Sequence, residues 1–134
     1  MSAPPTLSRQ RTQLTGRRIL VVEDEYFLAD DIGKTLRALG AEIVGPVGHL
    51  EDAVEILQDS NALDAAVLDV NLRNGMIFPI ARELRARHVP FVFTTGYDKI
   101  SIISEFQDVQ LLEKPIDLAA VARKLAALID DARI

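Results

Sequence analysis

Unbroken apolar runs alternate along this chain with longer stretches in which apolar residues recur at helical spacing. An unbroken run is typical of a strand buried on both faces of a sheet, and the longer repeat is typical of an amphipathic helix. The alternation begins near Arg18 and predicts five strand–helix units around a parallel sheet. We expect strands at residues 19–22, 42–44, 65–68, 91–94 and 110–112.

These strands are expected to differ in their place in the sheet. The second and fifth contain Glu42 and Gln110, and a polar residue is better tolerated at an edge than in the middle. Helices are expected over residues 28–39, 53–60, 80–87, 100–106 and 118–129. Because connections between parallel strands are right-handed, these helices cover both faces of the sheet in a three-layer α/β sandwich.

Length and composition agree with one folded domain. The chain has 134 residues, of which 49% are hydrophobic and 26% charged, as in an ordinary globular protein. Residues 1–16 are rich in polar residues and proline and have no apolar period, so we expect a flexible tail there and the domain over residues 17–134. The five units use all of that domain, so no separate effector domain is expected.

Charge and residue types argue against several classes of protein. A net charge of −5 does not suit a surface that follows the phosphates of nucleic acid. The absence of cysteine removes disulfide scaffolds and thiolate metal sites, and it suits a reducing compartment. No stretch is apolar over the about 18 residues that a membrane span requires. We therefore expect a cytoplasmic protein that contacts neither membrane nor nucleic acid directly.

Polar residues stand where four of the expected strands end. Glu23 and Asp24 follow the first strand, Asp69 the third, Thr95 the fourth and Lys114 the fifth. Ligands of parallel α/β folds bind at this edge of the sheet. Clustered carboxylates repel one another unless a cation is present, and oxygen ligands that leave room for water suit Mg²⁺. With a hydroxyl and an ammonium group nearby, the site suits a phosphoryl group, and Asp69 offers the nucleophile.

Each of these residues has a simpler explanation when it is taken alone. An acid after a strand is often a turn or capping residue, and Thr95–Gly96 and Lys114–Pro115 are sequences typical of loops. Only their common position at one edge of one sheet favours a functional site. The residues that we expect to lie on the surface away from that edge are His49, His88, Arg82, Arg85 and Arg87.

Four segments together resemble the receiver domain of bacterial two-component response regulators. They are residues 19–25 (ILVVEDE), 66–72 (AVLDVNL), 93–98 (FTTGYD) and 112–115 (LEKP). Their order and spacing match that family, and they span nearly all of the expected domain. The resemblance implies a flavodoxin-like fold, a five-stranded parallel sheet of order 2-1-3-4-5 and five helices.

The resemblance also implies a role for each acid at the sheet edge. Asp69 would accept the phosphoryl group, and Glu23 and Asp24 would form the acidic pair that binds Mg²⁺ with it. Asn71 would offer its backbone carbonyl to the same ion. Glu23 stands where an aspartate is commoner in the family, so one metal ligand is longer by a methylene group.

Further residues would recognise the phosphorylated state. Thr95 resembles the switch hydroxyl that moves toward the phosphoryl group, and Lys114 resembles the ammonium group that pairs with it. The Lys114–Pro115 bond resembles the family's cis peptide bond, which directs the lysine into the site. Gly96 would leave room for the approach of a phosphodonor.

The sequence departs from most receivers at the switch aromatic, whose position holds Leu111. In this respect it resembles a single-domain subgroup with a Phe-Ala-Thr-Gly-x-Tyr motif, and Tyr97 would replace the missing aromatic as the moving residue. Tyr97 and Asn71 also flank the path of attacking water, so they are expected to set the lifetime of the phosphate. The loop after Asp69 lacks the frequent Met-Pro pair.

These features predict a signalling protein that is switched by phosphorylation. A sensor histidine kinase or phosphotransfer protein would phosphorylate Asp69, and a downstream protein would recognise the change on an apolar surface. We expect that surface to include Ile100, Ile102, Ile103, Phe106, Leu111 and Leu112. A phosphate sink or a relay shuttle is the alternative.

We do not expect an enzyme, apart from the help that the domain gives to its own phosphorylation and dephosphorylation. A Mg²⁺-dependent phosphohydrolase that uses an aspartyl phosphate is the alternative from the enzyme class. It fits less well, because residues 23–25 do not supply the Asp-x-Asp pair that it requires.

Overall fold

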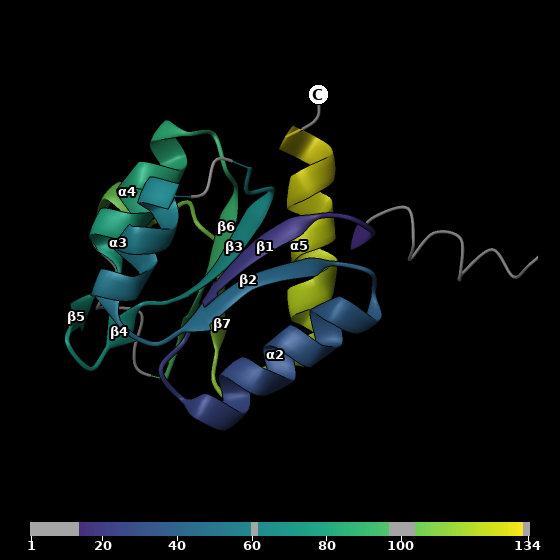
Figure 1. The fold of residues 1–134 in the computed structure, drawn as a ribbon, viewed down its shortest axis with the longest axis horizontal. Helices are drawn as coiled ribbons and strands as arrows, with labels where there is room; N and C mark the ends of the chain where they lie inside the picture. Colours follow the sequence, from purple (N-terminus) through teal and green to yellow (C-terminus); the bar gives the residue numbers. More distant parts are fainter. Residues whose placement is uncertain (1–13, 60–61, 97–103, 133–134) are drawn as a thin grey trace, which may run out of the picture.

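A five-stranded parallel sheet forms the centre of the computed structural model, which describes residues 14–59, 62–96 and 104–132 (Figure 1). The strands lie in the order β2-β1-β3-β6-β7. Their bounds are β1 (Arg18–Val22), β2 (Glu42–Val47), β3 (Ala65–Asp69), β6 (Phe91–Thr95) and β7 (Leu111–Glu113). The expected strand order and the edge positions of the second and fifth strands are confirmed.

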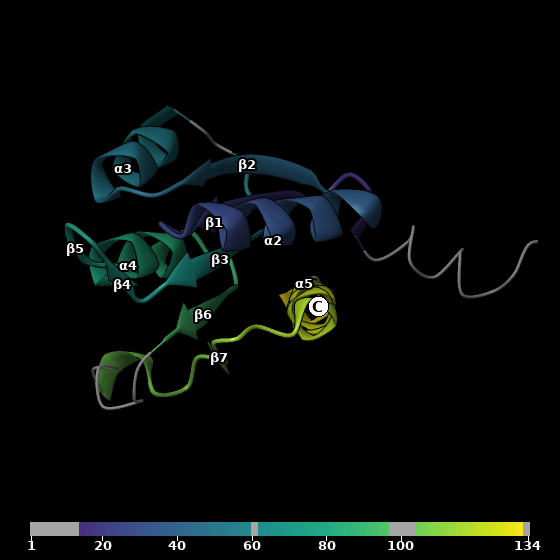
Figure 2. The ribbon, with the colours of Figure 1, turned by 90° about the horizontal axis from the view of Figure 1, so that it is seen from below.

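Helices form the two outer layers (Figure 2). α2 (Tyr26–Ala38) and α5 (Leu118–Ala132) pack together on one face, and α3 (Leu50–Asp59) and α4 (Phe78–Ala86) cover the other. Strand β1 shows why two layers form, because its successive side chains alternate between the faces. Ile19 and Val21 lie in the core beneath α2 and α5, whereas Leu20 and Val22 lie in the core beneath α3 and α4.

The last helix begins at a capping residue. The Oδ1 atom of Asp117 accepts hydrogen bonds from the N–H groups of Ala119 (3.0 Å) and Ala120 (3.3 Å), so it satisfies donors that the helix itself leaves free. This agrees with the start expected from the sequence. In the described ranges, no helix combines the length and apolar character needed to cross a membrane.

The chain packs against the sheet before the expected domain boundary. Leu14 is only 2% exposed and belongs to the core beneath α2 and α5, and the Gly16 N–H donates to the Gly40 carbonyl at 2.9 Å. Gly40 has a φ of +97°, and a Cβ added there would lie 2.8 Å from Thr15 Oγ1, so both backbone and space require glycine. Residues 14–16, at the end of the expected tail 1–16, thus pack with the domain, and residues 1–13 lie outside the described ranges.

A small hairpin that the apolar pattern did not predict follows β3. β4 (Asn71–Leu72) and β5 (Gly75–Met76) pair as antiparallel strands. In the turn between them, the Nδ2 atom of Asn74 donates to Glu51 Oε1 at 2.7 Å, and its Oδ1 atom accepts from the Leu50 N–H at 3.4 Å. These contacts attach the hairpin to the first turn of α3.

The fourth expected helix, residues 100–106, lies mostly outside the described ranges. Its last residues, Ser104–Phe106, form the 3₁₀ helix η2, so the described part of the chain contains four α-helices where five helices were expected. Phe106 is 1% exposed and stacks on Phe78 with 5.6 Å between the ring centroids. Phe106 is therefore a core residue, which corrects its expected place on an apolar docking surface.

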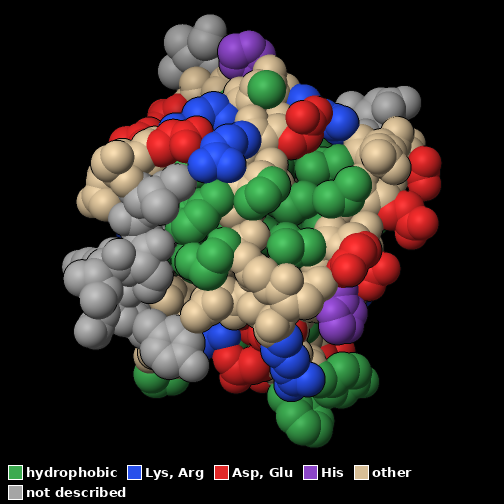
Figure 3. Space-filling model, turned by 90° about the vertical axis from the view of Figure 1, so that its left-hand side faces the viewer, with side chains coloured by type: hydrophobic (Ala, Val, Ile, Leu, Met, Phe, Trp, Pro, Cys, Tyr) green, Lys and Arg blue, Asp and Glu red, His purple; other side chains and the backbone are tan. Residues whose placement is uncertain are grey.

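Charged side chains surround an apolar patch on the side formed by α3 and α4 (Figure 3).

Two arginines of α4 form ion pairs with the segment that follows residue 103: Arg82 pairs with Glu105 at 3.0 Å, and Arg85 pairs with Asp108 at 3.1 Å. The expected surface position of these arginines is right, and they also hold η2 against α4.

Candidate functional site

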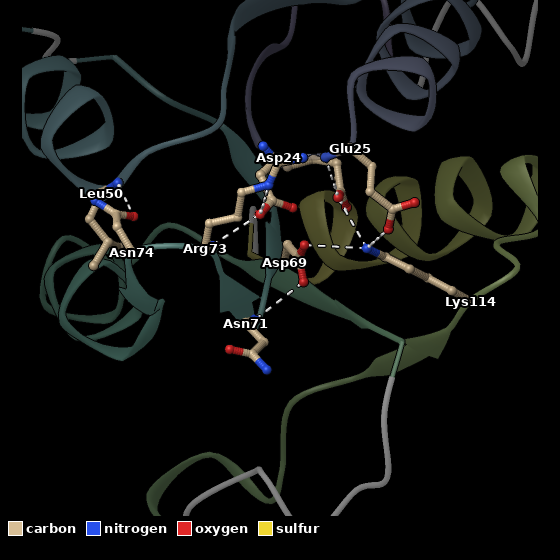
Figure 4. Close-up of polar contacts among 9 residues, drawn as sticks. Asp24, Glu25, Leu50, Asp69, Asn71, Arg73, Asn74 and Lys114 are labelled. Carbon is tan, nitrogen blue, oxygen red and sulfur yellow. Dashed lines mark hydrogen bonds and ion pairs between the residues drawn. The ribbon is translucent and has the colours of Figure 1, made fainter.

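Polar residues from several strand ends lie together at one edge of the sheet. Glu23 and Asp24 follow β1, Asp69 ends β3, and Lys114 follows β7. Because these strands are parallel, their carboxyl ends meet at the same edge. Figure 4 shows the side chains of Glu25, Asp69 and Lys114 directed toward one another, with Asp24 beside them.

Three carboxylates form the centre of the site. One carboxylate oxygen of each of Glu23, Asp24 and Asp69 lies within 4.8 Å of the others. Glu23 and Asp69 are buried, whereas Asp24 is half-buried. Mg²⁺ prefers oxygen ligands and keeps several water molecules, so buried carboxylates beside a partly exposed one fit this ion.

Lys114 balances part of the negative charge. Its Nζ donates to Glu25 Oε2 at 2.5 Å, to Glu23 Oε2 at 3.0 Å and to Asp69 Oδ2 at 3.3 Å. Burial acts to lower the pKa of Lys114, but the hydrogen bonds with Glu25 and Glu23 and the charge of Asp69 raise it overall. The lysine therefore stays charged and holds three carboxylates near one another.

Asp69 has a strongly raised pKa. Burial and the neighbouring charge of Glu23 raise the pKa of Asp69 to about 7, although Lys114 and the Asn71 N–H act in the opposite direction. The Asn71 N–H donates to Asp69 Oδ1 at 3.2 Å. Without a cation, this carboxyl group holds a proton for part of the time at neutral pH, and a cation beside it would favour the ionised form.

The carboxylates open into a pocket of about 540 Å³. Its lining consists of Asp24, Glu25, Asp69, Asn71, Leu72, Arg73, Gly96 and Lys114. Gly96 lies on the same wall as Lys114, where a Cβ added to it would be in ordinary van der Waals contact with Lys114 Cδ at 3.6 Å. The volume accommodates a phosphoryl group together with a hydrated cation.

Other residues singled out in the sequence lie around this centre. Thr95 is buried at the end of β6, and its carbonyl accepts a hydrogen bond from the Lys114 N–H at 2.8 Å. Leu111 is half-buried and packs against the core beneath α3 and α4. The Lys114–Pro115 peptide bond is cis, as the resemblance implies. Tyr97 lies outside the described residues.

Three residues in contact with the acidic centre were not singled out from the sequence. Thr94 Oγ1 donates to Glu23 Oε1 at 3.4 Å, Glu25 pairs with the lysine, and the Arg73 N–H donates to Asp24 Oδ2 at 3.0 Å. Glu25 could have been found from the sequence, because it belongs to the acidic run that follows β1. Thr94 could also have been found, because a hydroxyl group inside a buried strand needs a hydrogen-bond partner. The place of Arg73 depends on the hairpin, and no local pattern indicates it.

Solved structures similar to this chain include receiver proteins. SdrG from Sphingomonas melonis Fr1 is 42% identical, with 87% of this chain and 98% of that chain covered and a TM-score of 0.73. A structure described as the BeF3-activated conformation of SdrG from Pseudomonas melonis Fr1 is also 42% identical, covers 84% of this chain and 95% of that chain, and has a TM-score of 0.68. A response regulator receiver protein from Sinorhizobium medicae WSM419 is 25% identical, with 87% and 97% covered and a TM-score of 0.77.

Among curated proteins, the chain is similar to part of a longer regulator. It is 29% identical over 107 residues to the transcriptional regulatory protein PdtaR from Mycobacterium tuberculosis. The match covers 77% of this chain and 52% of PdtaR, so the chain spans about half the length of that relative. No protein-family model matches the sequence.

Proposed function

This chain belongs to the response regulator receiver family of two-component systems, and on that premise we propose that Asp69 accepts a phosphoryl group from a phosphohistidine. The donor would be a sensor histidine kinase or a phosphotransfer protein. The observation that carries the proposal is the position of Asp69 between two acids and Lys114, on the wall of an open pocket. This arrangement supplies a nucleophile, cation ligands and a counter-ion for the transferred group.

The proposed transfer makes one bond and breaks one. An oxygen of Asp69 forms a P–O bond as the P–N bond of the donor breaks, and the electron pair of that bond stays on the imidazole nitrogen, which takes up a proton. Only the ionised carboxylate is a good nucleophile. The pKa of about 7 for Asp69 therefore makes a cation at this site important for reactivity as well as for binding.

The residues present fit Mg²⁺. Glu23, Asp24 and Asp69 would hold it, together with the backbone carbonyl of Asn71. When bound, the ion supplies charge neutralisation at the phosphoryl oxygens. The more exposed Asp24 leaves room for the water molecules that Mg²⁺ retains.

Lys114 and Thr95 would recognise the product. Lys114 already contacts Asp69 at 3.3 Å, so a small movement toward the phosphoryl group would exchange carboxylate partners for phosphoryl oxygens. Thr95 ends the strand beside β3, and its hydroxyl would donate to the same group. Two expectations from the sequence stay predictions. One is that Tyr97 replaces the switch aromatic whose usual position holds Leu111, and the other is that the chain belongs to the Phe-Ala-Thr-Gly-x-Tyr subgroup.

The output would be a change in a protein-interaction surface that a downstream protein recognises, or, for a sink or shuttle, the removal or onward transfer of the phosphate. Receiver-domain regulators are in general signalling proteins, and we propose no catalysis beyond the domain's own phosphorylation and dephosphorylation. We propose the cytoplasm as its location, since a chain without cysteine suits a reducing compartment.

Phosphorylation by a small donor tests the proposal. The full chain is incubated with phosphoramidate and Mg²⁺, and its intact mass is measured. We expect one added phosphoryl group that is stable in acid and labile in base, and none on Asp69→Asn. Full labelling of Asp69→Asn would show that another residue is the acceptor, and the absence of labelling in the wild type would refute the proposal.

A further inference from the structure

Arg73 extends over the acidic pocket from the turn between β4 and β5. Its N–H donates to Asp24 Oδ2 at 3.0 Å, and its guanidinium Nε lies 3.7 Å from the same oxygen (Figure 4). The side chain of Arg73 is 79% exposed, whereas that of Asp24 is 14% exposed. The backbone of Arg73 is thus fixed to the site while its charged group has room to move.

Contacts of the hairpin fix the backbone position of Arg73. Asn71 pairs with Met76 and Leu72 with Gly75, and Asn74 joins the turn to α3 through Glu51. The backbone of the turn is therefore held at both strands and at its tip. A conformational change of the guanidinium requires only side-chain rotation, because the backbone contact with Asp24 does not depend on it.

The carboxylates around the pocket form ion pairs with two basic side chains. Lys114 contacts Glu23, Glu25 and Asp69, and Arg73 contacts Asp24. Asp24 is also one of the three carboxylates that can hold a metal ion. A divalent cation at this centre would therefore compete with the guanidinium for the same carboxylate.

We propose that Arg73 is an exchangeable counter-ion of the site: it pairs with Asp24 until a divalent cation binds there, and then turns to the phosphoryl group at Asp69. The inference rests on the proposed function of Asp69. One carboxylate oxygen of Asp24 and one of Asp69 lie within 4.8 Å of each other, so the guanidinium would have to move by a distance that a flexible arginine side chain can cover. A planar guanidinium also matches phosphoryl oxygens, with which it forms two parallel hydrogen bonds.

Cation binding tests the first half of this inference. The binding of Mg²⁺ to the full chain is measured by calorimetry for the wild type, Arg73→Ala and Arg123→Ala, at one pH and ionic strength. Arg123 is an exposed arginine of α5 that lines the groove between α2 and α5, so it controls for the loss of one positive charge. We expect Arg73→Ala to bind Mg²⁺ about 3-fold more tightly, because one exposed ion pair no longer competes, and Arg123→Ala to bind like the wild type.

The rate of phosphorylation tests the second half. With phosphoramidate at saturating Mg²⁺, we expect Arg73→Ala to be phosphorylated about 5-fold more slowly than the wild type, because a charge-assisted contact with the phosphoryl group is lost. Arg73→Lys should recover part of the rate. A purely structural role of Arg73 would weaken Mg²⁺ binding and slow phosphorylation together, whereas the proposal requires opposite changes.

Two results would refute the role of Arg73 and leave the proposed function of Asp69 standing. One is weaker or unchanged Mg²⁺ binding in Arg73→Ala. The other is an unchanged rate of phosphorylation in Arg73→Ala while Asp69 of the wild type is phosphorylated. A wild-type protein that takes up no phosphoryl group would refute the proposed function and the phosphoryl half of the inference with it. In that case tighter Mg²⁺ binding by Arg73→Ala would still support the competition at Asp24.

Discussion

Replacement of Asp69 by asparagine should stabilise the folded protein when no divalent cation is present. The change keeps the size of the side chain and removes one negative charge from a buried group of carboxylates. Lys114 keeps two of its partners, Glu23 and Glu25. The new amide can also donate a hydrogen bond to Glu23, which a carboxylate cannot do.

The magnitude follows from the pKa of Asp69, which is about 7 in the folded protein against an ordinary value of 3.8. A raised pKa means that the folded state binds this proton more tightly than the unfolded state. The stability that protonation supplies is present below pH about 4 and is lost as the pH rises through about 7. The difference corresponds to about 4 kcal/mol at pH about 8, and it already includes the opposing contact with Lys114. Because an amide reproduces the hydrogen bonds of a protonated carboxyl group only in part, we expect a net gain of about 2 kcal/mol in Asp69→Asn.

Urea unfolding measures this gain. In EDTA at pH about 8, we expect Asp69→Asn to have the larger free energy of unfolding by about 2 kcal/mol, with the difference shrinking toward pH about 5. Millimolar Mg²⁺ should stabilise the wild type much more than the variant, because the proposed ion would bind only the folded protein and would lose one of its carboxylate ligands in the variant. Glu55→Gln removes an exposed acid of α3 and is the control, for which little change is expected.

An Asp69→Asn protein that is equally or less stable than the wild type in EDTA at pH about 8 would refute this reasoning. It would mean that the contacts of Asp69 with Lys114 and the Asn71 N–H outweigh burial and repulsion from Glu23. A gain that stays constant between pH about 5 and 8 would also contradict the argument, because it could not arise from the titration of Asp69.

Two further predictions concern packing. Leu14→Ala should lower the free energy of unfolding by about 2 to 3 kcal/mol in urea, because it empties a buried site in the core beneath α2 and α5; an unchanged stability would show that Leu14 belongs to the tail after all. Phe106→Ala should cost about 3 to 4 kcal/mol, since it removes the ring that stacks on Phe78, and a loss below about 1 kcal/mol would indicate that η2 is not firmly packed.

The apolar pattern was sufficient to predict where the strands lie and which residues follow them. Residues 65–69 are buried without interruption, so a parallel strand in the middle of the sheet was the natural interpretation. Once the strands are parallel, Glu23, Asp69 and Lys114 must approach the same edge. The place of the acidic site could thus be predicted from the sequence alone, although the role of each residue in it comes from the family resemblance.

The hairpin at residues 71–76 was not predictable in the same way. Its strands have two residues each, which is too short for a period to appear. Its place is set instead by Asn74, which contacts α3 some 23 residues away in the sequence. Leu14 was missed for a related reason, because one apolar residue within a polar stretch carries no periodic signal.

The sequence by itself determined the layers and the position of Glu23, Asp24, Asp69 and Lys114 at one edge of the sheet, because these depend on burial patterns repeated along each element, whereas the strand order followed from the resemblance to receiver domains. The tertiary structure decided which of those residues contact one another. Lys114 and Glu23 are separated by 91 positions, and only the register of the sheet brings the ammonium group within 3.0 Å of the carboxylate. The same holds for Arg73 and Asp24, which lie 49 positions apart: their contact depends on long-range packing, and that packing has no counterpart in the local pattern of the chain.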